Sequence, residues 1–232
     1  MSNPTHRPAA AGAAATESFP LPAWLRRTIW ITAIVLALVF VAHAAARFLV
    51  FTEASYRNLW VNRLWLLPHF LAGSMALLCG VVQFSAALRR RRPDVHRWIG
   101  RVYLAAVAAS AACAYAMSFR AVLGWPFGVA AFVMATAWVG ATIMAFIAIR
   151  HGQVCVHREW MLRSTLITFA FVTFRVMLVS PLFTGLGSVP ERLTALLWLS
   201  WTVPLLINEL ILQRHTVVHG LSGRAVLRPA QS

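Results

Sequence analysis

Charged residues are scarce in this chain of 232 residues. Only 12% of the residues are charged, whereas 60% are hydrophobic, and the mean hydropathy is +0.71. A soluble domain usually carries about 25% charged residues. The composition therefore excludes an ordinary soluble domain and predicts a protein whose main solvent is lipid.

Lysine is absent, and acidic residues are few. All 21 basic residues are Arg, against 6 acidic residues, which gives a net charge of +15. Nucleic-acid binding needs a solvated basic face, but here the Arg residues lie at the ends of apolar runs. We therefore expect no nucleic-acid partner and predict contacts with anionic lipid headgroups. An Arg-only, Ala-rich chain also suits a bacterium of high GC content, so we expect the cytoplasmic (inner) membrane.

Cysteine is also rare, with Cys79, Cys113 and Cys155 far apart in the chain. They form no CxxC pair, so neither a metal-thiolate site nor a disulfide framework is indicated. We predict no bound metal ion from the residue pattern.

Long apolar runs are what the chain has in abundance. A helix needs about 20 apolar residues to cross a bilayer, and six runs qualify. The sequence therefore predicts an all-α bundle of six transmembrane helices over 28–212, with an N-terminal tail (1–27) and a C-terminal tail (213–232). The six runs are 28–51, 64–88, 98–119, 128–149, 160–181 and 192–212.

The distribution of Arg between the two sets of helix ends predicts the orientation of the bundle. Fifteen Arg residues lie on the side of both termini, and six lie on the other side. Because basic loops are retained in the cytoplasm, both termini are expected to face it.

Three of the apolar runs carry polar residues at helical spacing. Ionisable groups at membrane depth usually face the interior of a bundle and mark functional sites. One stripe of polar residues along a helix face begins at His157 and ends at Arg175, with hydroxyl groups between them. The second stripe runs from His69 to Gln83 through small residues, which permit close contact with another helix, and the third begins at His96.

Two similar motifs, PDVHRWIGRVY at 93–103 and VHREWMLRS at 156–164, stand at the cytoplasmic starts of two runs. Guanidinium groups bind carboxylates and phosphates bidentately, and His can add sensitivity to pH. The pattern predicts a polar site, open to the cytoplasmic face, that binds or moves a small anionic ligand or a lipid headgroup. Alternatively, the Arg residues at helix ends are only anchors at the membrane surface. The candidate ligand-binding residues are His69, Gln83, His96, Arg97, Arg101, His157, Arg158, Arg163, Thr168 and Arg175.

A second hypothesis is electron transfer through haem b, with His96 and His157 as axial ligands at similar depth on two helices. A redox role would follow if haem binds. A hydrolytic enzyme is less favoured, because no paired carboxylates lie within the apolar runs. The HREWM motif also lacks the second His of a zinc protease, since Met161 stands in its place.

Four segments together resemble a family of prokaryotic membrane proteins known as domain of unknown function 2306. They are PHFLAGSMALLCGVVQF at 68–84, HRWIGRVY at 96–103, HREWMLRS at 157–164 and the TFAFVTFR that ends at Arg175. The resemblance covers roughly residues 64–180. It implies an integral membrane protein of a family without an established activity, and it gives none of these residues a role.

Overall fold

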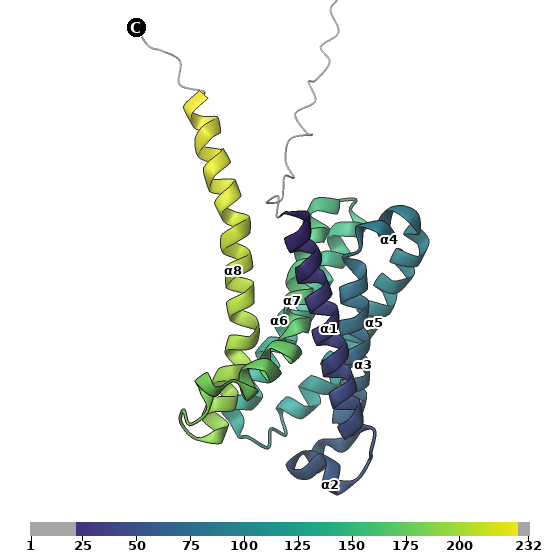
Figure 1. The fold of residues 1–232 in the computed structure, drawn as a ribbon, viewed down its shortest axis with the longest axis vertical. Helices are drawn as coiled ribbons and strands as arrows, with labels where there is room; N and C mark the ends of the chain where they lie inside the picture. Colours follow the sequence, from purple (N-terminus) through teal and green to yellow (C-terminus); the bar gives the residue numbers. More distant parts are fainter. Residues whose placement is uncertain (1–21, 227–232) are drawn as a thin grey trace, which may run out of the picture.

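Within the described residues, six long helices form the bundle in this computed structural model (Figure 1). The structure describes the backbone of residues 22–226 and the side chains of 22, 24, 25 and 27–214. In chain order the long helices are α1 (Ala23–Phe48), α3 (Arg63–Gln83), α5 (Pro93–Ser118), α6 (Trp125–Arg150), α7 (Val154–Val179) and α8 (Val189–Val226).

Short helical segments connect the long ones. Within the described residues there is no strand. Figure 1 places α2 at one end of the bundle and α4 at the other, together with the start of α1 and the end of α8. We call these the α2 end and the α4 end. The short segments are α2 (Glu53–Tyr56), η1 (Arg57–Asn62), α4 (Ala86–Arg91) and η2 (Pro181–Phe183).

All six predicted helices are present, and each is long and apolar enough to cross a membrane. Each begins before its apolar run; α5 begins at Pro93 and α7 at Val154. A proline suits the first turn of a helix, because its missing N–H would have no partner there. The His-Arg motifs therefore lie inside the first turns of α5 and α7.

The predicted tails are only partly described. Residues 1–21 and 227–232 lie outside the described residues. The α1 helix begins within the predicted N-terminal tail, at Ala23, and α8 continues beyond residue 212 to Val226.

Small residues bring α3 and α5 into close contact. A Cβ atom added to Gly73 would lie 3.3 Å from the Ser110 hydroxyl oxygen, and one added to Gly80 would lie 3.4 Å from the Tyr103 ring. Because glycine lets helix backbones approach each other, the two predicted stripes of α3 and α5 face one another. This pair, with α6 and α7, encloses most of the buried core.

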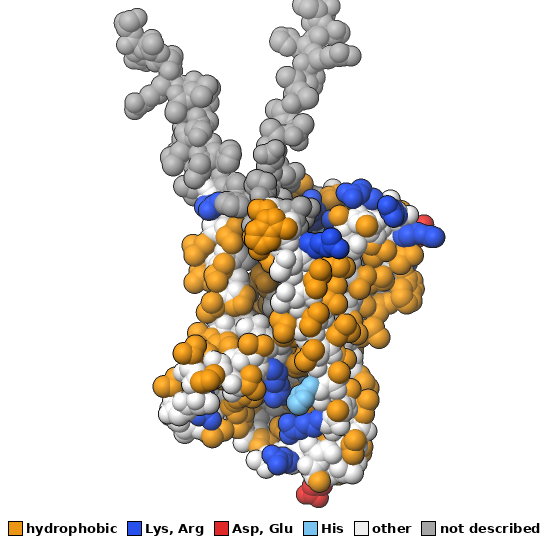
Figure 2. Space-filling view, viewed as in Figure 1, with side chains coloured by type: hydrophobic (Ala, Val, Ile, Leu, Met, Phe, Trp, Pro, Cys, Tyr) orange, Lys and Arg blue, Asp and Glu red, His pale blue; other side chains and the backbone are white. Residues whose placement is uncertain are grey.

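The α1 and α8 helices lie at the edge of the bundle. The α1 helix packs on α3 and α7, whereas α8 packs on α7 and α6. Their outward side chains are apolar and exposed, such as Val39 and Leu210. Figure 2 shows an apolar surface between Arg residues at the α4 end and a second group of Arg residues nearer the α2 end. This distribution matches a helix bundle that spans a lipid bilayer.

Candidate functional site

A buried network of hydroxyl groups occupies the middle of the bundle. The Tyr103 hydroxyl of α5 lies 2.6 Å from the Ser164 hydroxyl and 2.9 Å from that of Thr168, both on α7. All three side chains are fully buried. Buried polar groups must find partners to offset their lost hydration. The network thus explains the hydroxyl groups of the predicted α7 stripe as a link between helices.

The same network extends to α6. The Trp138 indole N–H donates to the Thr168 hydroxyl oxygen at 2.9 Å, and the Thr142 hydroxyl lies 2.7 Å from that of Ser164. Thr168, a predicted ligand-binding residue, is therefore occupied by interactions among α5, α6 and α7.

His69 lies closer to the α2 end, between α3 and α5. Its Nδ1 atom is 2.9 Å from the Ser110 carbonyl oxygen. The ring also meets Phe171 of α7 edge to face, with centroids 5.4 Å apart. These contacts fix His69 against both neighbouring helices.

A second polar cluster lies at the α4 end, where α3 meets α5. The Gln83 side-chain N–H donates to the His96 carbonyl oxygen at 2.9 Å, and the half-buried Arg89 donates to the Gln83 carbonyl oxygen at 3.2 Å. A Cβ atom on Gly100 would lie 3.1 Å from the Gln83 amide nitrogen, so glycine makes room for this side chain. Gln83 Oε1 and His96 Nδ1 are buried without a hydrogen-bond partner among the described residues.

His157 and Arg158 of α7 complete this cluster. His157 Nδ1 lies 2.8 Å from the Ala145 carbonyl oxygen of α6. The ring is close enough to His96 for an electrostatic interaction, and His96 in turn interacts with Arg89. We call Gln83, Arg89, His96, His157 and Arg158 the α4-end cluster.

The electrostatics of the cluster are unfavourable for its own cations. Burial lowers the pKa of the Arg89 guanidinium, and the positive charges of Arg158 and Arg90 lower this pKa further. Arg89 and Arg158 form no ion pair with a described residue. An anion placed between them would relieve this repulsion.

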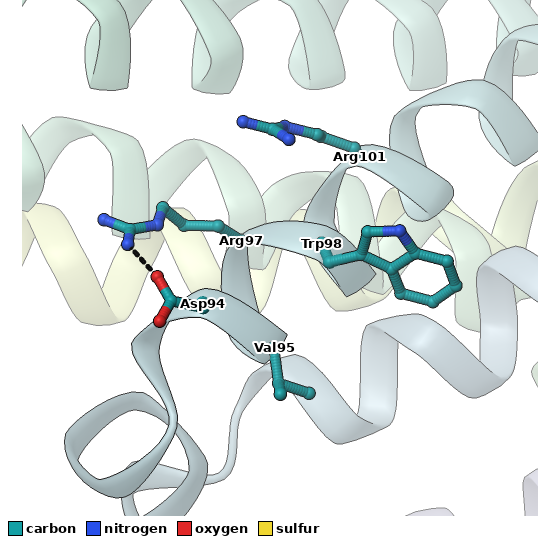
Figure 3. A pocket seen from close by; sticks show the side chains of 5 residues that line it. All are labelled: Asp94, Val95, Arg97, Trp98 and Arg101. Atoms are coloured by element: carbon teal, nitrogen blue, oxygen red, sulfur yellow. Dashed lines mark hydrogen bonds and ion pairs between the residues drawn. The ribbon is translucent and has the colours of Figure 1, made fainter.

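Arg97 and Arg101 lie on a different side of α5. They line a shallow hollow of about 670 Å³ together with Val95 and Trp98. Figure 3 shows Arg97 turned toward its ion-pair partner Asp94, whereas Trp98 points the other way. All these side chains come from the first three turns of α5. Arg101 forms no ion pair within the described part of the chain.

Arg163 joins two helices. Its guanidinium makes two hydrogen bonds to the Glu209 carboxylate of α8, at 2.6 and 2.9 Å. Glu159 lies 3.7 Å away on the same helix, and the guanidinium covers the Trp160 ring. Because its charge is compensated, Arg163 is better placed to hold α8 against α7 than to bind an external anion.

Arg175 lies near the α2 end, well separated along α7 from His157. It is close enough to Arg47 of α1 to be repelled electrostatically. Arg47 itself donates to the Ser55 carbonyl oxygen at 3.0 Å. The predicted stripe from His157 to Arg175 therefore passes through three different surroundings.

The predicted site residues thus lie at several separate locations in the bundle. His96, His157, Arg158 and Gln83 come together at the α4 end, whereas Arg97 and Arg101 face the hollow beside them. Sequence reasoning missed Arg89, because it belongs to the run Arg89–Arg92, which reads as a topology signal. The sequence signal that could have identified Arg89 is its position six residues after Gln83, just beyond the turn at Ser85. Within the described side chains, no group of three His, Cys, Asp or Glu residues is placed to hold a metal ion.

Comparison with protein families identifies a matching family model. The family model described as "Predicted membrane protein (DUF2306)" matches residues 66–212, which is more than half of the chain. The chain belongs to the DUF2306 family. Within this DUF2306 protein, the matched region includes α5, α6 and α7 and all five residues of the α4-end cluster. No curated protein and no solved structure matched the chain.

Proposed function

We propose that this DUF2306 protein binds an anionic group, a phosphate or a carboxylate, at the α4-end cluster. The ligand is either a small anion or a lipid headgroup. Because the Arg-rich ends are expected in the cytoplasm, the site opens to the cytoplasmic face of a bacterial inner membrane.

The observation that carries the proposal is a gathering of cations without a compensating acid. The cations Arg89 and Arg158 meet at one end of the bundle together with His96 and His157, and the four side chains come from three different helices. The nearby acids have other partners: Asp94 pairs with Arg97, and Glu159 and Glu209 pair with Arg163. Arg suits this task, because its fork of N–H donors matches the oxygens of carboxylate and phosphate.

Two buried atoms in the cluster support a ligand with hydrogen-bonding groups. Gln83 Oε1 can accept a hydrogen bond, and His96 Nδ1 can donate or accept one. A hydroxylated phosphate ester offers both an anionic group and hydroxyl donors. An unpartnered buried polar atom costs free energy, so such a ligand would stabilise the bundle.

The test measures thermal unfolding of the purified full chain in detergent, with and without inorganic phosphate or glycerol phosphate. A ligand at about 100 times its Kd should raise the melting temperature by roughly 5–10 °C. Arg89→Gln and Arg158→Gln should remove most of this shift. Arg150→Gln, which changes an exposed Arg at the same end of the bundle, should preserve it. An equal shift in all three variants would reject the α4-end cluster as the site.

The haem hypothesis stays a prediction. A reduced-minus-oxidised visible spectrum of the purified protein tests it directly, because haem b gives Soret and α bands.

A further inference from the structure

An apolar groove runs between α1 and α3 and ends beside the α4-end cluster. It has a volume of about 410 Å³ and is lined almost entirely by apolar atoms. Several of its wall residues remain exposed, including Trp30, Leu38 and Val82. The walls are formed by Trp30, Ile34 and Leu38 of α1 on one side, and by Leu78, Val82 and Leu88 of α3 and α4 on the other.

Two Arg residues lie close in sequence to the wall residues at the α4 end of this groove. Arg27 precedes Trp30 by three residues and Ile34 by seven, so it lies on the same face of α1 as the groove wall. Arg89 directly follows Leu88, the last residue of the opposite wall. Neither Arg forms an ion pair within the described part of the chain. The groove is thus apolar along its length and positively charged at one end.

Trp30 marks the transition between these two regions. Its indole N–H points to the Val81 carbonyl oxygen, 3.4 Å away across the groove. Tryptophan is enriched at the level of lipid headgroups, since one part of its ring is polar and the rest apolar. Its position near the α4 end places the groove in the acyl-chain region and the two Arg residues at headgroup level.

We propose that this groove holds one anionic phospholipid, with an acyl chain between α1 and α3 and its phosphate between Arg27 and Arg89. The inference rests on the proposed function only through Arg89, and it names the ligand class as a lipid. Charge complementarity selects the headgroup. A small soluble anion would leave the apolar walls unused, and a zwitterionic lipid would bring its own cation toward Arg27 and Arg89.

The experiment counts lipids bound to the detergent-purified full chain by native mass spectrometry. Three probes are titrated separately: phosphatidylglycerol, phosphatidylcholine and glycerol phosphate. Phosphatidylglycerol tests an anionic headgroup together with acyl tails. Phosphatidylcholine tests acyl tails with a headgroup of no net charge, and glycerol phosphate tests the anionic headgroup without tails. Val82→Trp and Leu38→Trp fill the groove from opposite walls, and Arg27→Gln removes one cation. The controls are Val203→Trp, an equally exposed position on α8, and Arg150→Gln.

The expected result is one tightly held phosphatidylglycerol in the wild type. Both groove-filling variants and Arg27→Gln should weaken its binding about tenfold, and the two control variants should retain it. Phosphatidylcholine should bind at least about tenfold more weakly than phosphatidylglycerol. If Val82→Trp and Val203→Trp lose phosphatidylglycerol binding equally, or both retain it equally, the bound lipid is annular lipid only. Either result would overturn the inference. If the groove-filling variants have unchanged melting temperatures, their loss of lipid binding results from filling of the groove and not from unfolding.

The glycerol phosphate arm separates this inference from the proposed function. If glycerol phosphate binds in an Arg158-dependent way while the groove variants bind lipid normally, the groove proposal fails and the anion site stands. If the groove variants lose phosphatidylglycerol and no soluble anion ever binds, the lipid site stands without the soluble-anion function.

Discussion

At the scale of single residues, the Tyr103 hydroxyl joins α5 to α7 in a network that also includes α6. We expect Tyr103→Phe to remove a hydrogen bond from the buried hydroxyls of Ser164 and Thr168, which keep their partners on α6. The net loss of a hydrogen bond costs about 0.5–1.5 kcal/mol, which would lower the melting temperature by a few degrees. Thermal unfolding in detergent measures this loss. Tyr115→Phe is the control, because its hydroxyl bond to Thr136 is exposed. Equal melting temperatures for the two variants would contradict a stabilising role for the network.

Two glycines of α6 should respond to alanine in opposite directions. A Cβ atom on Gly128 would lie 2.4 Å from the Ser118 carbonyl oxygen, so the end of α5 must move. Overpacking of this kind costs about 1–3 kcal/mol. Gly140 has no atom within 4 Å of such a Cβ, and alanine there should gain up to about 1 kcal/mol from helix propensity. Denaturation curves of Gly128→Ala and Gly140→Ala should therefore move to opposite sides of the wild type.

The sequence predicted some of these residues and could not predict others. His69 and Gln83 stood out because a polar residue within an apolar run is costly and therefore noticeable. The partner of Arg163 did not stand out, since Glu209 lies 46 residues further along the chain and on another helix. Arg89 was hidden among neighbouring Arg residues. A residue's type is visible in the sequence, but its partner across the bundle is not.

At the scale of helices, the Arg163–Glu209 ion pair fixes α8 to α7. Glu209→Gln should weaken this contact, because the partly buried guanidinium loses its main counter-charge. Glu159→Gln removes a longer and more exposed contact to the same guanidinium, so it should cost less. We expect a lower melting temperature for Glu209→Gln than for Glu159→Gln. Cross-linking between engineered cysteines on α7 and α8 would also decrease. The reverse order would show that Glu159 is the more important partner.

Helical faces were easier to predict than helix neighbours. The period of His69, Gly73 and Gly80 predicted a face for close packing, and that face meets α5. In a membrane, however, lipid-facing and core-facing surfaces are similarly apolar. The sequence therefore gave no reason to place α1 on α3 and α7, or to leave the groove beside Trp30.

At the scale of the whole molecule, the Arg distribution predicts that the α4 end faces the cytoplasm. Cys155, exposed at the start of α7, reports on this end once Cys79 and Cys113 are replaced by Ala. An impermeant maleimide should label Cys155 only after the cells are permeabilised. Leu186→Cys, combined with Cys155→Ala, places a thiol at an exposed position between η2 and α8 at the other end, where intact cells should be labelled. The opposite labelling pattern would invert the orientation, and the α4-end cluster and the groove would then meet anions and lipids of the outer leaflet.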